Sequence, residues 1–172
     1  NITRFICAII CTFGVGTTAG NAAELPDWQD PELFQKNRLP MSAHFQTDGI
    51  KLDLNGVWNF RWYENIDDRD LDFFSKNYND SDWDTISVPG MWELNGYGAP
   101  LYNNFGFPWE GHYNPNPPFP CYEHNYAGQY RRNFVIGEEW KGKDIFLHIG
   151  SATSNVRVWI NGIEVGYSED SK

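Results

Sequence analysis

Hydrophobic and polar residues alternate most clearly in the last third of the chain. Val156, Val158 and Ile160 are separated by Arg157 and Trp159, which is the period of a strand with one buried face. The dipeptide that follows, Asn161-Gly162, suits a two-residue turn with positive φ at both positions. The sequence therefore predicts a tight β-hairpin with strands at residues 155–160 and 163–167.

Further short runs of apolar and aromatic residues indicate additional strands. They lie at residues 57–63, 85–88, 129–136 and 145–149, and turn signals such as Asn55-Gly56 and Pro89-Gly90 bound them. Short helical stretches are also expected at residues 32–36 and 71–76. Short strands without a long helix predict an all-β fold, an antiparallel β-sandwich of jelly-roll type. We expect it to extend from about residue 52 to about residue 167.

The first residues of the chain differ in kind from the rest. Arg4 precedes an apolar run at residues 5–15, and small residues follow as far as Ala23. A cation, a short apolar stretch and a small-residue region together are typical of a signal peptide, and the run is too short to span a membrane. The alternative interpretation is a buried strand or helix of the domain.

The signal-peptide interpretation predicts how the chain is organised. Residues 1–23 would be removed, residues 24–50 would form an irregular extension, and residues 51–172 would form the domain. The protein would then be secreted or periplasmic and would have no membrane span. Cys121 is the only cysteine outside residues 1–23, so neither an internal disulfide nor a cysteine metal site is expected.

Composition and charge narrow the classes of partner. The formal net charge of −10 argues against nucleic acid, whose phosphates need a basic surface, and against a polybasic membrane anchor. Aromatic residues make up 17% of the chain and can stack on sugars. Residues 96–127 combine six prolines with many aromatic and Asn residues. A segment of this kind indicates a functional loop, and its side chains suggest carbohydrate binding.

No residue pattern in the chain indicates catalysis. Glycoside hydrolysis usually needs two carboxyl groups that flank the bond, but the 23 acidic residues show no spacing that singles out a pair. The four histidines are scattered, and His148 is expected to be a histidine of the sheet. Nucleophile-elbow, phosphate-loop and dinucleotide motifs are absent from the sequence.

Several stretches resemble the N-terminal domain of the long β-galactosidases of glycoside hydrolase family 2. They occur in the family's order. They are residues 30–40 (DPELFQKNRLP), 54–60 (LNGVWNF), 88–97 (VPGMWELNGY), 99–104 (APLYNN), 107–108 (FP), 116–118 (NPP), 128–132 (GQYRR) with Phe134, 159–162 (WING) and 165–171 (VGYSEDS). Lys172 is a departure, because the family often has Arg there.

The resemblance implies a role for two residues. Asn104 matches an Asn that reaches the galactose subsite in the family, and an amide can both donate to and accept from sugar hydroxyls. Asp170 matches an Asp that contacts the sugar and a bound sodium ion, and a carboxylate suits both partners. Without the resemblance, a turn-forming Asn and a solvated carboxylate at a strand end would be the preferred interpretations of these residues.

The resemblance also implies what lies outside this chain. The catalytic glutamates of the family belong to a later (β/α)8 barrel, and its magnesium ligands lie mainly there. The expected protein is a retaining β-galactosidase that acts on terminal non-reducing β-D-galactose residues. Its expected partners are β-galactosides, its own later domains and further copies in a homo-oligomer. An independent carbohydrate-binding module, a β-glucuronidase and a β-mannosidase remain alternatives.

Overall fold

The described part of the chain is built from antiparallel strands and short 3-10 turns. The computed structural model describes residues 3–12, 27–30, 32–42, 44–100 and 125–169. The strands are β1 (Thr3–Thr12), β2 (Gln35–Lys36), β3 (Gly56–Tyr63), β4 (Asp84–Val88), β5 (Ala127–Ile136), β6 (Asn155–Ile160) and β7 (Ile163–Ser168). The 3-10 turns are η1 (Asp27–Gln29), η2 (Ile66–Asp68), η3 (Trp92–Asn95) and η4 (Glu138–Trp140).

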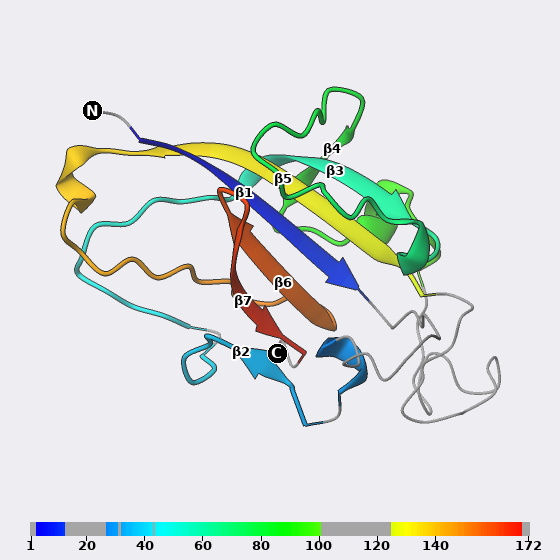
Figure 1. Ribbon diagram of the computed structural model, residues 1–172, viewed down its shortest axis with the longest axis horizontal. Helices are drawn as coiled ribbons and strands as arrows, with labels where there is room; N and C mark the ends of the chain where they lie inside the picture. Colours follow the sequence, from blue (N-terminus) through cyan, green and yellow to red (C-terminus); the bar gives the residue numbers. More distant parts are fainter. Residues whose placement is uncertain (1–2, 13–26, 31, 43, 101–124, 170–172) are drawn as a thin grey trace.

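The described strands join in one strongly twisted sheet. Their order is β2-β7-β6-β1-β5-β3-β4, and every neighbouring pair is antiparallel (Figure 1). The predicted all-β antiparallel class is confirmed, and the arrangement is consistent with a β-sandwich. None of the helical segments in the described residues combines the length and hydrophobicity that a membrane span requires.

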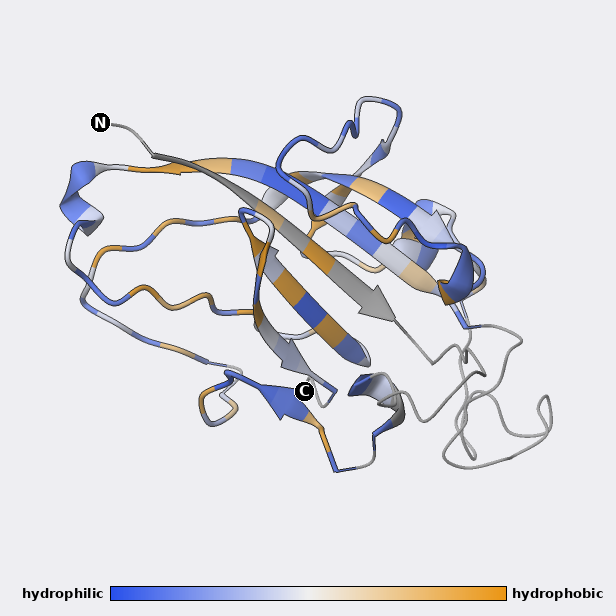
Figure 2. Cartoon of the chain, in the orientation of Figure 1, coloured by the Kyte–Doolittle hydropathy of each residue, from blue (hydrophilic) through white to orange (hydrophobic). Residues whose placement is uncertain are grey.

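The predicted hairpin at the end of the chain is also confirmed. Asn161 and Gly162 have φ values of 54° and 85°, as expected for a two-residue turn of this kind. Strand β6 pairs with β7 from Val156 opposite Ser168 to Ile160 opposite Ile163. Apolar and polar residues alternate along β6 (Figure 2), so the side chains of Val156 and Val158 face one side of the sheet and those of Arg157 and Trp159 the other.

Each face of the sheet carries its own hydrophobic core. On one face, Val156 and Val158 pack with Trp58 of β3 and Cys7 of β1. On the other, Trp159 packs with Phe73 and Trp83 from the connection between β3 and β4. A third cluster joins Phe60 of β3 and Ile86 of β4 to Trp92 of η3. The second layer of this part of the molecule is therefore largely made of connecting segments.

Three local predictions were wrong. Residues 145–149 form no strand, and most of their side chains are exposed, with Ile145 54% and Phe146 62% exposed, although Ile149 packs against a core cluster. The apolar run was recognisable, but a strand also needs a neighbour to pair with, and the described chain offers none there. Residues 32–36 contain a turn and strand β2 in place of a helix, and residues 71–76 form turns.

Strand β1 occupies a central position in the sheet. It pairs with β5 from Thr3 opposite Ile136 to Thr12 opposite Ala127, and with β6 from Cys7 opposite Ile160 to Thr12 opposite Asn155. This arrangement corresponds to the alternative interpretation of the apolar run as a buried strand. Removal of residues 1–23 would take away the strand that joins β5 to β6. The signal peptide and the domain limits stay predictions.

Candidate functional site

The two residues assigned to sugar binding from the family resemblance lie outside the described residues. Asn104 belongs to residues 101–124, and Asp170 directly follows the last described residue, Glu169. The structure therefore does not bring these two side chains together or separate them. It does describe the parts of the chain that precede them, up to residue 100 before Asn104 and up to residue 169 before Asp170.

The segment before Asp170 is held firmly against β2. Gln35 and Lys36 pair with Ser168 and Tyr167, and the Glu169 amide donates to the Phe34 carbonyl over 3.0 Å. The Ser168 hydroxyl accepts a hydrogen bond of 2.6 Å from Arg38. The backbone at the end of β7 is therefore fixed up to the residue that precedes Asp170.

Tyr167 connects this strand end to β6. Its hydroxyl accepts from the Asn155 amide over 2.7 Å and donates to the Glu169 carboxylate over 2.6 Å. Burial, followed by the hydrogen bond to the negative Glu169, raises the pKa of Tyr167 well above its usual range. Tyr167 is therefore a neutral donor at physiological pH, and the Glu169 carboxylate is already engaged.

Described residues before and after 101–124 meet in an aromatic cluster. Tyr97 precedes this segment and Tyr126 follows it, and both pack against Trp62 of β3, with ring centroids 6.5 Å and 5.2 Å away. Phe60 adds an edge contact with Tyr97 at 4.8 Å. The described residues on either side of 101–124 thus contribute rings to one aromatic platform, formed by Phe60, Trp62, Tyr97 and Tyr126.

A cavity of about 210 Å³ adjoins this platform. Its walls mix aromatic rings with two carboxylates and a guanidinium. They are formed by Phe60, Arg61, Trp62, Asp82, Trp83, Asp84 and Tyr97. The Asp84 carboxylate accepts from the Tyr97 hydroxyl over 3.0 Å. The buried indole N–H of Trp62 has no hydrogen-bond partner, so it is a donor for which the described chain provides no acceptor.

This composition suits a sugar. Aromatic rings can stack on the C–H face of a pyranose, and carboxylates and N–H groups can bond its hydroxyls. This cavity was not predicted from the sequence, although the sequence contained a signal. Trp62 follows Trp58 and Phe60 at alternate positions of β3, and Tyr97 ends the recognised stretch at residues 88–97. What could not be inferred was that the two rings meet.

The described residues contain no group of three or more His, Cys, Asp or Glu side chains that could hold a metal ion. The predicted sodium contact depends on Asp170, which lies outside them. Glu169, the described carboxylate that precedes Asp170 in the chain, already accepts a hydrogen bond from the Tyr167 hydroxyl. Sodium binding stays a prediction that rests on the family resemblance.

Comparison with known proteins assigns the class. The chain belongs to the family described as glycosyl hydrolases family 2, sugar binding domain, whose model matches residues 51–172. It is 40% identical over 161 residues to a β-galactosidase of Priestia megaterium (strain DSM 319 / IMG 1521), a match that covers 85% of this chain and 16% of the relative.

Two further relatives carry related names. A β-galactosidase large subunit of Leuconostoc lactis is 34% identical over 172 residues, covering 87% of this chain and 27% of the relative. A β-galactosidase of Clostridium acetobutylicum is 36% identical over 160 residues, covering 84% and 18%. The chain thus spans between 16% and 27% of the length of these three relatives.

Proposed function

We propose that this chain is the N-terminal sugar-binding domain of a longer, secreted, retaining β-galactosidase. The observation that carries the proposal is the family match over residues 51–172, together with the β-galactosidases among its relatives. The reaction is the hydrolysis of terminal non-reducing β-D-galactose residues. The catalytic carboxylates belong to a later barrel domain, so the chain alone is inactive.

In this proposal, Asn104 and Asp170 complete the galactose subsite from outside the barrel. The amide of Asn104 exchanges hydrogen bonds with sugar hydroxyls, and the Asp170 carboxylate accepts from a hydroxyl while it neutralises part of a sodium charge. The rigid end of β7 supports this role, because a fixed backbone orients the following side chain without further loss of conformational entropy. Magnesium, further domains and subunit contacts belong to the rest of the enzyme.

The test uses the full-length enzyme with the substitution Asp170→Asn. This change keeps the shape of the side chain and removes its charge, so sodium should bind more weakly. Hydrolysis should slow by roughly ten- to a hundred-fold, the effect of one charged hydrogen bond. Asn104→Ala should have a smaller effect, because a neutral contact is lost. Steady-state rates are measured across sodium concentrations, with thermal melts to monitor folding.

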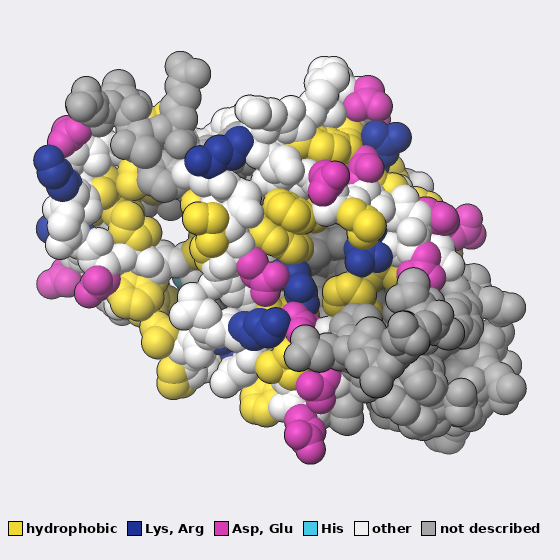
Figure 3. Space-filling model, in the orientation of Figure 1, with side chains coloured by type: hydrophobic (Ala, Val, Ile, Leu, Met, Phe, Trp, Pro, Cys, Tyr) yellow, Lys and Arg dark blue, Asp and Glu magenta, His cyan; other side chains and the backbone are white. Residues whose placement is uncertain are grey.

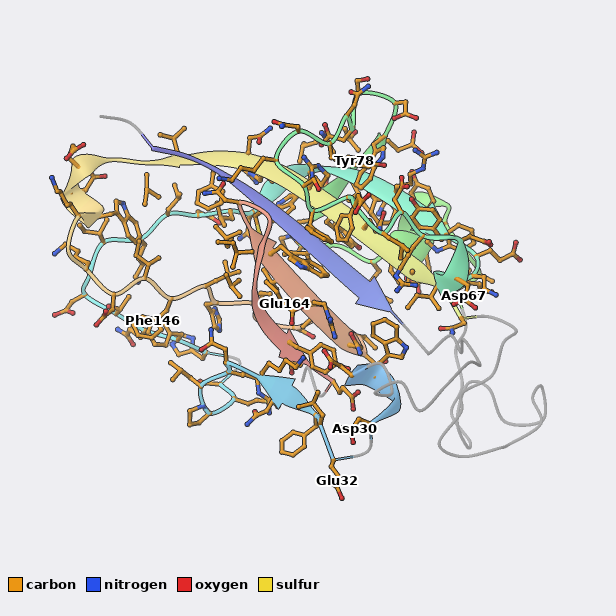
Figure 4. All side chains as sticks on the ribbon, in the orientation of Figure 1. Asp30, Glu32, Asp67, Tyr78, Phe146 and Glu164 are labelled. Carbon is orange, nitrogen blue, oxygen red and sulfur yellow. The ribbon has the colours of Figure 1, made fainter. Side chains whose placement is uncertain are left out.

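Glu32→Gln is the matched control. It removes one carboxylate from an exposed residue that points away from the strands (Figure 4), so wild-type rates and the wild-type sodium response are expected. If Asp170→Asn behaves like this control, Asp170 is only a solvated carboxylate and its assigned role is wrong.

The cavity beside Trp62 favours a second candidate, an independent carbohydrate-binding module. A module binds sugar without the rest of an enzyme, whereas a domain that contributes only the edge of a pocket binds weakly. Titration of the 172-residue chain with galactose separates the two. Binding at micromolar concentrations that Trp62→Phe weakens about fivefold, by loss of one neutral hydrogen bond, would favour the module.

A further inference from the structure

The described residues contain a second cavity, which is enclosed by three separate elements. It has a volume of about 160 Å³. Trp28 of η1, Arg69 and Asp70 after η2, and side chains from one face of β6 surround it. The complete lining is Trp28, Ile66, Arg69, Asp70, Leu71, Phe73, Phe74, Asn155, Arg157 and Trp159.

Two guanidinium groups lie against the same indole ring in this cavity. The guanidinium carbon of Arg69 is 5.1 Å from the ring centroid of Trp28, and that of Arg157 is 5.4 Å away. Both distances are within the range of a cation–π interaction. Like charges repel, so this arrangement is stable only where opposite charges or acceptors compensate for it.

Arg157 is fully compensated. It forms ion pairs with Asp27 and with Glu164 on β7, the second over 3.2 Å. Asp27 is in turn bound by Lys36 over 2.7 Å. Figure 3 shows the resulting mixture of basic and acidic side chains in the middle of this face, where β6 and β7 lie in Figure 1.

Arg69 is not compensated in the same way. Its side chain is partly buried and donates a hydrogen bond to the Ile66 carbonyl over 2.7 Å. It forms no ion pair within the described residues. Burial lowers the pKa of Arg69, the nearby Asp67 opposes this effect, and the Arg157 charge adds to it. A guanidinium has five N–H donors, so most of its donor capacity is unused.

The second donor in the cavity is the indole N–H of Trp28. This atom is buried and has no hydrogen-bond partner, which is costly unless an acceptor is supplied from elsewhere. The lining carboxylate of Asp70 is hydrogen-bonded by the Tyr78 hydroxyl. The cavity therefore presents unused donors beside apolar walls formed by Ile66, Phe73, Phe74 and Trp159.

We propose that this cavity is a binding site for a monovalent carboxylate attached to an apolar or aromatic body. The carboxylate accepts from the Arg69 guanidinium and from the Trp28 N–H, and the body packs on the partly buried Phe74 ring. The Asp70 carboxylate lines the same cavity and repels anions, so a dianion such as phosphate is less suitable than a monoanion. The proposal does not depend on the sugar contacts proposed for Asn104 and Asp170.

Benzoate is the probe that tests this proposal. The 172-residue chain is titrated calorimetrically with sodium benzoate, with benzyl alcohol as a neutral ligand of similar size, and with inorganic phosphate at matched ionic strength. Benzoate should bind at millimolar concentrations and more tightly than either of the others. Comparable binding of benzyl alcohol, or tighter binding of phosphate, would overturn the assignment of a monovalent carboxylate.

Substitutions locate the site. Arg69→Gln should weaken benzoate binding roughly ten- to a hundred-fold, as expected for the loss of a charged hydrogen bond. Trp28→Phe keeps an aromatic ring and removes the N–H donor, so a loss of about fivefold is expected. Lys143→Gln is the control, because Lys143 is an exposed cation that lines neither cavity. It should leave benzoate binding unchanged.

Folding of each variant is checked by circular dichroism before titration. If Arg69→Gln does not fold, Arg69→Lys and Trp28→Phe still test the site, since lysine keeps the charge but loses the planar donor array. Wild-type chain that is folded but does not bind benzoate would overturn the proposal. So would folded Arg69→Gln with wild-type affinity.

Discussion

The Arg131 guanidinium donates to the Asp80 carboxylate over 2.9 Å beneath the connection between β3 and β4. The Arg131 side chain is only 4% exposed, and that of Asp80 is 22% exposed. Asn59 also donates to Asp80 over 3.0 Å, and the Tyr78 ring lies 5.2 Å from the guanidinium carbon. This pair therefore fastens the connection to β3 and β5.

Asp80→Asn should destabilise the fold strongly. The substitution leaves the buried Arg131 charge without its carboxylate, and removal of one partner of a buried ion pair typically costs about 3–5 kcal/mol. Asp82→Asn is the control, because the Arg61–Asp82 pair is exposed and should contribute less than about 1 kcal/mol. Urea unfolding measures both. Equal urea midpoints for the two variants would show that the Arg131–Asp80 pair contributes no more to the free energy of unfolding than the exposed Arg61–Asp82 pair.

The same pair predicts a pH dependence. Partial burial raises the pKa of Asp80, but hydrogen bonds from Asn59 and Arg131 outweigh that effect and lower the pKa below its ordinary value. The stabilising contribution is therefore complete above the unfolded pKa of about 3.9 and is lost as pH falls through the lower folded value. The difference in unfolding free energy between wild type and Asp80→Asn should shrink below about pH 4. A difference that grows on acidification would contradict this assignment.

Gly128 is required by close packing on β5. A Cβ at this position would lie 2.5 Å and 2.7 Å from two ring atoms of Trp92 and 2.9 Å from the Phe60 ring. Gly128→Ala should therefore cost about 1–3 kcal/mol through overpacking. Gly150→Ala is the control, since the nearest atom would be 4.0 Å away, on His148. Thermal melts compare the two, and an unchanged melting temperature for Gly128→Ala would refute the packing.

Cys7 should be almost inert in the folded chain. It is fully buried on β1, and burial raises the pKa of its thiol to about 12. Because the thiolate is the reactive form, labelling at pH 8 should be roughly a thousandfold slower than in the unfolded chain, where the pKa is about 8.5. The measurement uses a chromogenic disulfide reagent on the Cys11→Ser, Cys121→Ser background, with and without urea. Rapid labelling without urea would show that β1 is not buried between β5 and β6 in the folded chain.

Deletion of residues 1–23 tests the position of β1 directly. The shortened chain would lose the strand that pairs with both β5 and β6, so it should unfold at a clearly lower urea concentration. The signal-peptide prediction implies the opposite result, because the mature protein would begin near Glu24 and would have to be stable without residues 1–23. Terminal sequencing of protein exported from an expressing cell, together with the urea midpoint of the shortened chain, decides between them.

Much of the fold was accessible from local patterns. Strands β3, β4, β5, β6 and β7 and the Asn161-Gly162 turn were predicted, because alternation and turn chemistry are local properties. The wrong strand at residues 145–149 shows the limit, since Phe146 is apolar but has no strand beside it. The cavities were not predictable for a similar reason. Trp28, Arg69 and Arg157 are far apart in the sequence, and only the folded sheet brings them around one space.

The central place of β1 determines when the sheet can be completed. This strand is synthesised first, yet its partners at residues 127–136 and 155–160 come more than a hundred residues later. At about 5–20 residues per second, the ribosome needs roughly six to thirty seconds to supply them. Contacts of such sequence separation also slow the final pairing itself. Throughout that interval residues 3–12 are an unpaired apolar segment, open to capture by any chaperone or export factor that recognises one, so translation speed becomes a determinant of this domain's fate.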